Sequence, residues 1–111
     1  MKRKVILIQS EGLGRDDKRL GSLLMASFLR LLGESEDKPV SLVFWNEGVR
    51  LLCKESKVMD HLKRLEEQGI EILACTTCLE YFDLTDKLVI GKPTTMHKSV
   101  ESILSCDIVS L

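Results

Sequence analysis

Aromatic side chains are scarce in this 111-residue chain, and neither sign of charge predominates. Aromatic residues make up 5% of the sequence, and 16 Lys and Arg balance 17 Asp and Glu, which gives a formal net charge of −1. Domains that bind nucleic acid through a basic face with stacking rings have a different composition. We therefore expect no nucleic-acid partner.

Long hydrophobic runs are missing as well. A membrane-spanning helix needs about 20 consecutive apolar residues, and no stretch of the sequence approaches that length. The basic start, Met1–Lys4, precedes an apolar run over residues 5–8, which is shorter than the roughly 7–15 residues of a secretory signal. We expect a cytoplasmic protein with no membrane partner, whose cysteines are reduced thiols.

The sequence does contain enough apolar residues for one core. Hydrophobic residues make up 44% and charged residues 30%, as in ordinary globular proteins, and we expect a single domain over residues 1–111. Strands are predicted at residues 5–8, 39–45, 70–74, 88–90 and 107–109, with helices between them. This alternation predicts a three-layer α/β/α fold with a mainly parallel five-stranded sheet.

Two long helices and four loops follow from the same pattern. The first helix is expected to begin after Asp16 or Asp17, to be mostly buried, and to end at Gly33. The second is expected to run from Ser56 to Gln68. Ligands bind at the carboxyl ends of parallel strands, so candidate sites belong in the loops at residues 10–17, 45–49, 75–81 and 91–95.

The strongest chemical signal is Cys75-Thr76-Thr77-Cys78, which follows the third expected strand and opens a helix. A thiolate is the reactive form of cysteine, and the unpaired N–H groups of a helix start favour its charge. The spacing brings Cys78 within one helical turn of Cys75, so one cysteine can carry a persulfide and the other can release it as a disulfide. The alternative is that both are small hydrophobic side chains of the core.

Zinc and nucleotide sites are weaker interpretations. A structural zinc site needs four ligands, commonly in two closely spaced pairs, and Cys53 and Cys106 are isolated. The turn at Gly12 and Gly14 resembles a dinucleotide-binding loop, but Asp17 replaces the third glycine and would repel a phosphate. We expect no metal and no cofactor, and we interpret both glycines as tight-turn residues with positive φ.

A cleft at the carboxyl edge of the sheet would bring further residues to the cysteines. Trp45 and Asn46 end the second expected strand, where Trp45 can form the floor of a pocket and Asn46 can supply a hydrogen bond. Trp45 can equally fill the core or a subunit interface. The possible cleft lining is Gly12, Gly14, Arg15, Trp45, Asn46, Thr76 and Thr77.

Several short motifs occur in an order and spacing that is similar to a known family. They are Glu11-Gly12-Leu13-Gly14-Arg15 before an Asp-rich helix start, Leu20-Gly21, Asn46-Glu47-Gly48-Val49, and Ile72-Leu73-Ala74-Cys75-Thr76-Thr77-Cys78-Leu79. Together they resemble the DsrE-like family, most closely the DsrE-like domain of YedF-type, sulfurtransferase-like selenium-metabolism proteins. The resemblance covers essentially the whole chain.

The resemblance implies an oligomeric α/β protein that relays sulfur as a persulfide. It places the persulfide on Cys75 and matches Cys78 to the second cysteine of the YedF-type motif. It implies small sulfur- or selenium-donor and acceptor proteins as partners, TusA-like proteins among them. The chain departs from the family at Asp16, where a glycine is expected. A TusA-like domain usually precedes a YedF-type domain, and we expect none here because 111 residues leave no room for one.

Three functions are therefore considered. The first is a sulfur or selenium carrier in which Cys75 accepts the chalcogen and Cys78 resolves it. The second is a dithiol–disulfide redox protein that uses the same pair, and the third is a non-catalytic subunit that binds a partner in its cleft. A homo-oligomer is also expected, because the last helix is apolar at Met96, Val100, Ile103 and Leu104.

Overall fold

Strands and helices alternate along the chain in the computed structural model, which describes residues 3–111. The strands are β1 (Lys4–Ile8), β2 (Ser41–Phe44), β3 (Glu71–Cys75), β4 (Lys92–Thr94) and β5 (Asp107–Ser110). The α-helices are α1 (Lys18–Glu34), α2 (Met59–Glu67), α3 (Thr76–Tyr81) and α4 (Met96–Ser105), and the 3-10 helices are η1 (Asn46–Leu52) and η2 (Thr85–Lys87).

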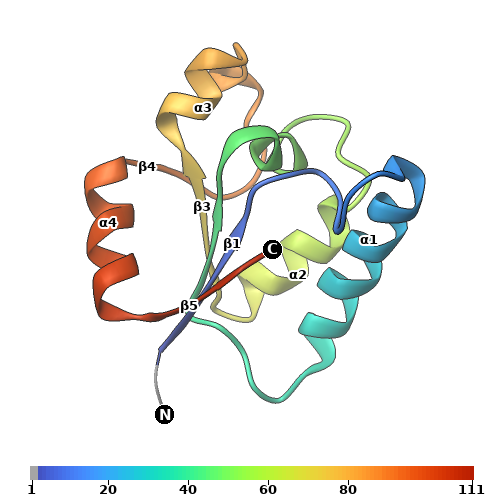
Figure 1. Cartoon of the computed structure of the whole chain (residues 1–111), viewed down its shortest axis with the longest axis horizontal. Coiled ribbons are helices and arrows are strands. Elements are labelled where there is room, and N and C mark those ends of the chain that lie inside the picture. The colour runs from blue at the N-terminus through green and yellow to red at the C-terminus, as the bar shows by residue number, and fades with distance from the viewer. Residues whose placement is uncertain (1–2) are drawn as a thin grey trace.

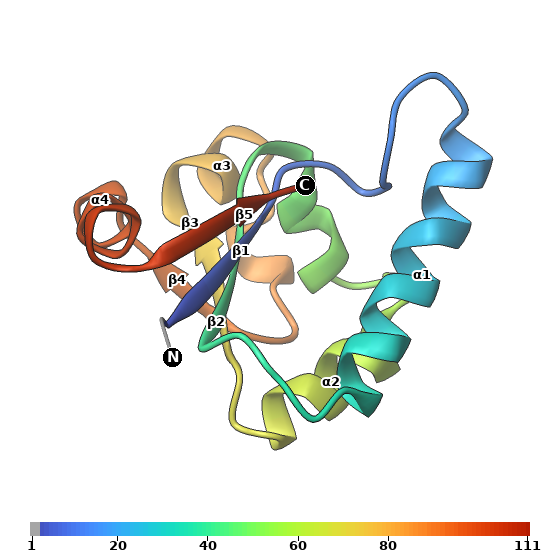
Figure 2. The ribbon, with the colours of Figure 1, turned by 60° about the horizontal axis from the view of Figure 1, so that its bottom comes forward.

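The five strands form one sheet in the order β4-β3-β2-β1-β5, and every neighbouring pair is parallel. Helices α1 and α2 lie on one side of the sheet and α4 lies on the other (Figures 1 and 2). The predicted α/β fold with a parallel five-stranded sheet is confirmed. The sheet brings the carboxyl ends of β1, β2 and β3 to one edge, where ligands of parallel sheets bind.

Both faces of the central strands are buried, which explains their continuous apolar runs. Successive side chains of a strand point to opposite faces. On one face, Ile6 and Ile8 of β1 pack with Met25, Leu29 and other residues of the main core. On the other face, Val5, Leu7 and Val43 form a smaller buried cluster, which α4 covers.

The fourth strand lies at a different place from the one predicted. The prediction of a strand at residues 88–90 is wrong. Leu88 makes only an isolated antiparallel bridge to Cys53, and the N–H groups of Val89 and Ile90 both donate to the Leu52 carbonyl. The strand is instead Lys92–Thr94, whose proline is tolerated because β4 is an edge strand. The loop predicted at 91–95 is therefore largely strand.

Helix α1 is much less buried than predicted. Its buried residues are Gly21, Met25, Leu29 and Gly33, and leucines on its opposite side are exposed. The N-cap is Asp17, which is one of the two predicted alternatives. Its carboxylate accepts the Leu20 N–H at 2.9 Å. Gly33 does not end the helix, which continues to Glu34. Gly33 is buried because the Arg64 side chain packs over it, 3.5 Å from where a Cβ would lie.

The second long helix is shorter than predicted. It begins at Met59 rather than Ser56, and a turn occupies the residues between them. Gly69 follows its end with a φ of 92°, a conformation that glycine adopts without strain.

Candidate functional site

Cys75 is the last residue of β3 and the N-cap of α3. Its Sγ accepts the backbone N–H of Cys78 at 3.3 Å, which is the hydrogen bond that a capping side chain makes at a helix start. Because β3 pairs with β2 on one side and β4 on the other, the position of Cys75 is fixed. The side chain is only 5% exposed.

Cys78 lies one turn further and is half-buried. Its Sγ accepts the backbone N–H of Asn46 at 3.1 Å. Burial raises the pKa of the Cys78 thiol, its hydrogen bond with the Cys75 side chain raises it further, and the Asn46 N–H acts in the opposite direction. At neutral pH Cys78 is therefore held as a thiol beside Cys75, where it can serve as a hydrogen-bond and proton donor.

The Asn46 donor is positioned by an unusual turn after β2. Asn46 has a φ of 52°, in the left-handed region that asparagine tolerates better than most residues. Its own Oδ1 accepts the Glu47 N–H at 2.9 Å. Asn46 was predicted to supply a hydrogen bond, and the bond that the structure contains comes from its backbone rather than from its side chain.

Gly48 allows this turn to lie against the end of β1. A Cβ at Gly48 would lie 2.4 Å from the carbonyl oxygen of Ile8, well inside van der Waals contact. The same oxygen accepts the Trp45 N–H at 3.0 Å, and the Gly48 N–H donates to Trp45 at 2.9 Å. The glycine of the Asn46-Glu47-Gly48 motif is therefore required by a close backbone approach.

Thr76 connects the site to the edge strand. Its Oγ1 donates to the carbonyl of Thr94 at 2.9 Å, which ties the start of α3 to the end of β4. Thr77 is exposed. Thr76 therefore has a structural contact near Cys75.

An arginine and two aromatic side chains gather at the carboxyl end of α3, and sequence reasoning missed all three. The Arg50 guanidinium lies 4.6 Å from the centre of the Phe82 ring, and its Nε pairs with Glu47 at 2.5 Å. Tyr81 packs edge-on against Phe82 with ring centroids 5.2 Å apart, and it is 83% exposed. The signal that could have indicated them is the aromatic pair three residues after Cys78.

The β1–α1 loop packs on its own helix. Gly14 has the predicted positive φ, 82°. The prediction of a positive φ is wrong for Gly12. Glycine is needed there for a steric reason, because a Cβ would lie 2.8 Å from the backbone carbonyl carbon of Gly21. Arg15 is exposed.

Asp16 occupies the position where the family resemblance predicts glycine, and its φ is 73°. An aspartate in this conformation is strained, though less than a branched residue. We expect Asp16→Gly to raise the free energy of unfolding by about 0.5 kcal/mol, because the relieved strain slightly exceeds the entropy cost of glycine. Urea unfolding measures the change. Asp16→Ala is the control, and equal stabilisation by alanine would show that φ is not the cause.

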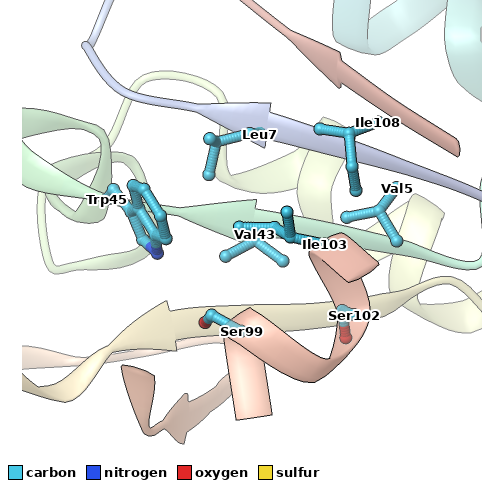
Figure 3. Close-up of a pocket in the computed structure, with 8 residues that line it drawn as sticks. All are labelled: Val5, Leu7, Val43, Trp45, Ser99, Ser102, Ile103 and Ile108. Atoms are coloured by element: carbon cyan, nitrogen blue, oxygen red, sulfur yellow. The ribbon is translucent and has the colours of Figure 1, made fainter. Parts of the chain in front are cut away.

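Trp45 is half-buried and borders a small space between α4 and the sheet (Figure 3). The other lining residues are Val5, Leu7, Val43, Ser99, Ser102, Ile103 and Ile108. The space is about 10 Å³, at the limit for one water molecule. Its size and its apolar walls favour the interpretation of Trp45 as a core residue over that of a pocket floor.

Cys53 and Cys75 are equally buried but differ in their hydrogen bonds. They are 4% and 5% exposed. The Cys53 thiol donates to the Val49 carbonyl at 3.3 Å, and burial raises the pKa of Cys53, an effect that Arg50 only partly offsets. The Cys75 sulfur instead accepts the Cys78 N–H at the start of α3.

We expect iodoacetamide, a small neutral reagent, to alkylate Cys75 first at neutral pH. Cys53 and Cys106 are expected to be slowest, and Cys53 is the control for burial. Timed alkylation with peptide mapping gives the order. Earlier labelling of Cys53 or Cys106 would show that the reactive site is elsewhere, and earlier labelling of Cys78 would exchange the roles of the pair.

Residues 3–111 contain neither a membrane-spanning helix nor a metal-binding cluster. Within that range no helix is long and apolar enough to cross a membrane. In the same part of the chain, no three His, Cys, Asp or Glu side chains gather as a metal-binding group.

Comparisons with known proteins agree with this fold. A model of the DsrE/DsrF-like family matches residues 3–110. The chain is similar in structure to ychN from E. coli, with 18% identity, a TM-score of 0.76 and 100% of both chains covered. It is also similar to MTH1491 from Methanobacterium thermoautotrophicum, a protein of unknown function, with 21% identity, a TM-score of 0.73 and 100% of both chains covered. No curated protein matches the sequence.

Proposed function

The chain belongs to the DsrE/DsrF-like family, and on this premise we propose that it is a sulfur carrier that holds sulfur as a persulfide on Cys75. The family is generally linked to sulfur relay. Within it, we place the chain nearest the DsrE-like domain of YedF-type proteins, because Cys78 provides a second cysteine in the motif. The same chemistry applies to selenium.

The observation that carries the proposal is the placement of the two sulfurs at the junction of β3 and α3, with Cys75 as the N-cap and Cys78 beside it. Cys75 is the N-cap of α3 and accepts the Cys78 N–H, while Cys78 accepts the Asn46 N–H and has a pKa raised by burial and by its hydrogen bond with the Cys75 side chain. This arrangement holds Cys78 as a thiol directly beside the Cys75 sulfur. It supports Cys75 as the nucleophile and Cys78 as its proton donor and later resolving thiol.

The proposed reaction needs no external oxidant. The Cys75 thiolate attacks the outer sulfur of a donor persulfide, an S–S bond forms at Cys75, and the donor leaves as a thiolate. An acceptor thiolate then takes the outer sulfur in the same way, and Cys75 leaves as a thiolate. The added sulfur extends the reactive atom about 2.05 Å beyond the buried Cys75 sulfur.

Cys78 provides a second route for release. The Cys78 sulfur attacks the Cys75 Sγ, a Cys75–Cys78 disulfide forms, and the outer sulfur leaves as hydrosulfide with the proton of the Cys78 thiol. The two thiols lose the electrons that the outer sulfur gains, so the step balances. A dithiol reductant then restores the pair by exchange.

We propose small sulfur- or selenium-donor and acceptor proteins, TusA-like proteins included, as partners, and a cytoplasmic location for the reaction. The exposed Tyr81 and the Arg50–Phe82 stack beside α3 support docking there, because Tyr and Arg are enriched at binding hot spots. We also propose a homo-oligomer, supported by the exposed apolar side chains of α4, which are Met96, Val100, Ile103 and Leu104.

Incubation with glutathione persulfide, followed by intact-mass measurement, separates the three candidate functions. Cys78→Ser is measured beside the wild type, because it cannot resolve the persulfide. A gain of one sulfur atom on the variant supports the carrier. A wild-type disulfide with no sulfur gain on the variant would indicate a redox protein, and no change in either chain would indicate a non-catalytic subunit.

A further inference from the structure

Four leucines of α1 are exposed on the side of the helix that faces away from the core. Leu20 is 53% exposed, Leu23 61%, Leu24 45% and Leu31 53%. At 100° per residue they fall on one stripe, opposite the buried Met25 and Leu29. In both views α1 lies at the outside of the molecule, and α2 and the sheet are on one side of it only (Figures 1 and 2).

A small residue, Ser27, lies at the centre of this stripe of leucines. Ser27 is exposed, and it lies midway along the chain between Leu23 and Leu31. A small side chain at a helix crossing permits close approach of the two axes. If two α1 helices cross antiparallel at Ser27, Leu23 of each faces Leu31 of the other, so the stripe is complementary to a second copy of itself.

Apart from the N-cap Asp17, the charges at the two ends of α1 oppose its own dipole. Its first turn contains Lys18 and Arg19 and no acid, and its last turn contains Glu34 and no base. Such charges weaken an isolated helix. In an antiparallel pair, the cationic start of one helix lies beside the anionic end of the other. Glu34 also pairs with Arg30 of its own helix at 3.4 Å, but both side chains remain half exposed.

We propose that a second copy of this chain docks on the exposed stripe of α1, with the two helices antiparallel about a two-fold axis at Ser27. Arg19 of each copy then lies near Glu34 of the other, on the same flank of the contact. A parallel pair would instead place like charges together. The proposal is independent of the sulfur chemistry, since α1 contributes no residue to the Cys75–Cys78 turn.

Two variants of the full chain test the contact by its effect on molecular mass in sedimentation equilibrium. Ser27→Lys places two like charges on the axis, and we expect it to halve the mass of the assembly, because loss of a two-fold contact separates its halves. Ser22→Lys is the matched control: Ser22 is exposed on the same helix, about 140° away from Ser27. It should leave the mass unchanged.

A charge exchange tests the antiparallel direction. Arg19→Glu and Glu34→Lys should each weaken association by about three- to tenfold, although each improves the match to the helix dipole. Mixed in equal amounts, the two variants should associate as the wild type does. At one end of the mixed pair the introduced glutamate of one copy meets the introduced lysine of the other, and at the opposite end the native Arg19 meets the native Glu34.

A wild-type chain that stays at 12.6 kDa across the concentration series would overturn the proposal. An assembly whose mass is unchanged by Ser27→Lys would also overturn it, because a contact through α4 alone would not be affected by that variant. Failure of the mixed variants to recover association would overturn the antiparallel arrangement. Circular dichroism of each variant confirms that α1 is folded before the masses are compared.

Discussion

A Cys75→Ser chain is expected to transfer no sulfur. Serine has no ionisable thiol and cannot form a persulfide, so the rate of transfer from glutathione persulfide to an acceptor thiol should fall by on the order of 10³-fold or more, to the background. The fold should survive, because serine is a preferred N-cap residue and its Oγ can accept the Cys78 N–H in place of the sulfur.

The matched variant is Cys78→Ser. It keeps the nucleophile and removes the resolving thiol, so loading with sulfur should persist while release as hydrosulfide stops. Transfer by Cys75→Ser at the wild-type rate would show that Cys75 is not the carrier. Equal loss of loading in both variants would show that the pair acts only as a disulfide.

Gly48→Ala is expected to destabilise the chain by about 2–4 kcal/mol. The new Cβ would lie 2.4 Å from the Ile8 carbonyl oxygen, and neither backbone segment can move without breaking the Trp45–Ile8 hydrogen bond. Overpacking of backbone against backbone belongs to the costly class of substitutions. The displaced turn also moves Asn46 away from Cys78, so the order of thiol reactivity should change with the stability.

Gly69→Ala is the control for Gly48→Ala. Gly69 has a φ of 92° with no atom near its missing Cβ, so alanine there should cost only about 1–2 kcal/mol of conformational strain. Urea unfolding of both variants gives the two free energies. A Gly48→Ala chain as stable as the control would show that the turn is not locked against β1.

The sequence predicted the fold where apolar runs are buried on both sides. β1, β2 and β3 are central strands, and their runs fell close to the observed ones. β4 was misplaced because an edge strand of three residues, Lys92–Thr94, pairs on one side only and needs no apolar run. The apolar residues at 88–90 instead belong to a loop that packs against η1.

Helix α1 shows a different limit. Its leucines surround most of the circumference, and that pattern predicts burial on all sides. Only one face packs against the rest of this chain, so apolar periodicity alone does not distinguish a core face from an apolar face that the chain leaves exposed.

The site was predictable in part. The position of Cys75 and Cys78 at a strand-to-helix junction follows from local sequence. The Asn46–Cys78 hydrogen bond does not, because it joins residues 32 positions apart and depends on the positive φ of Asn46. Gly12 was identified as a turn residue, but its close approach to Gly21 depends on tertiary packing.

Peptide mapping of the sulfur-loaded Cys78→Ser chain tests the central claim most directly. A tryptic peptide that spans residues 65–87 then contains Cys75 as its only cysteine. We predict that fragmentation places one additional sulfur atom on Cys75 after incubation with glutathione persulfide, and that a dithiol reductant removes it. Sulfur on Cys53 or Cys106, or no additional sulfur on any cysteine, would contradict the account.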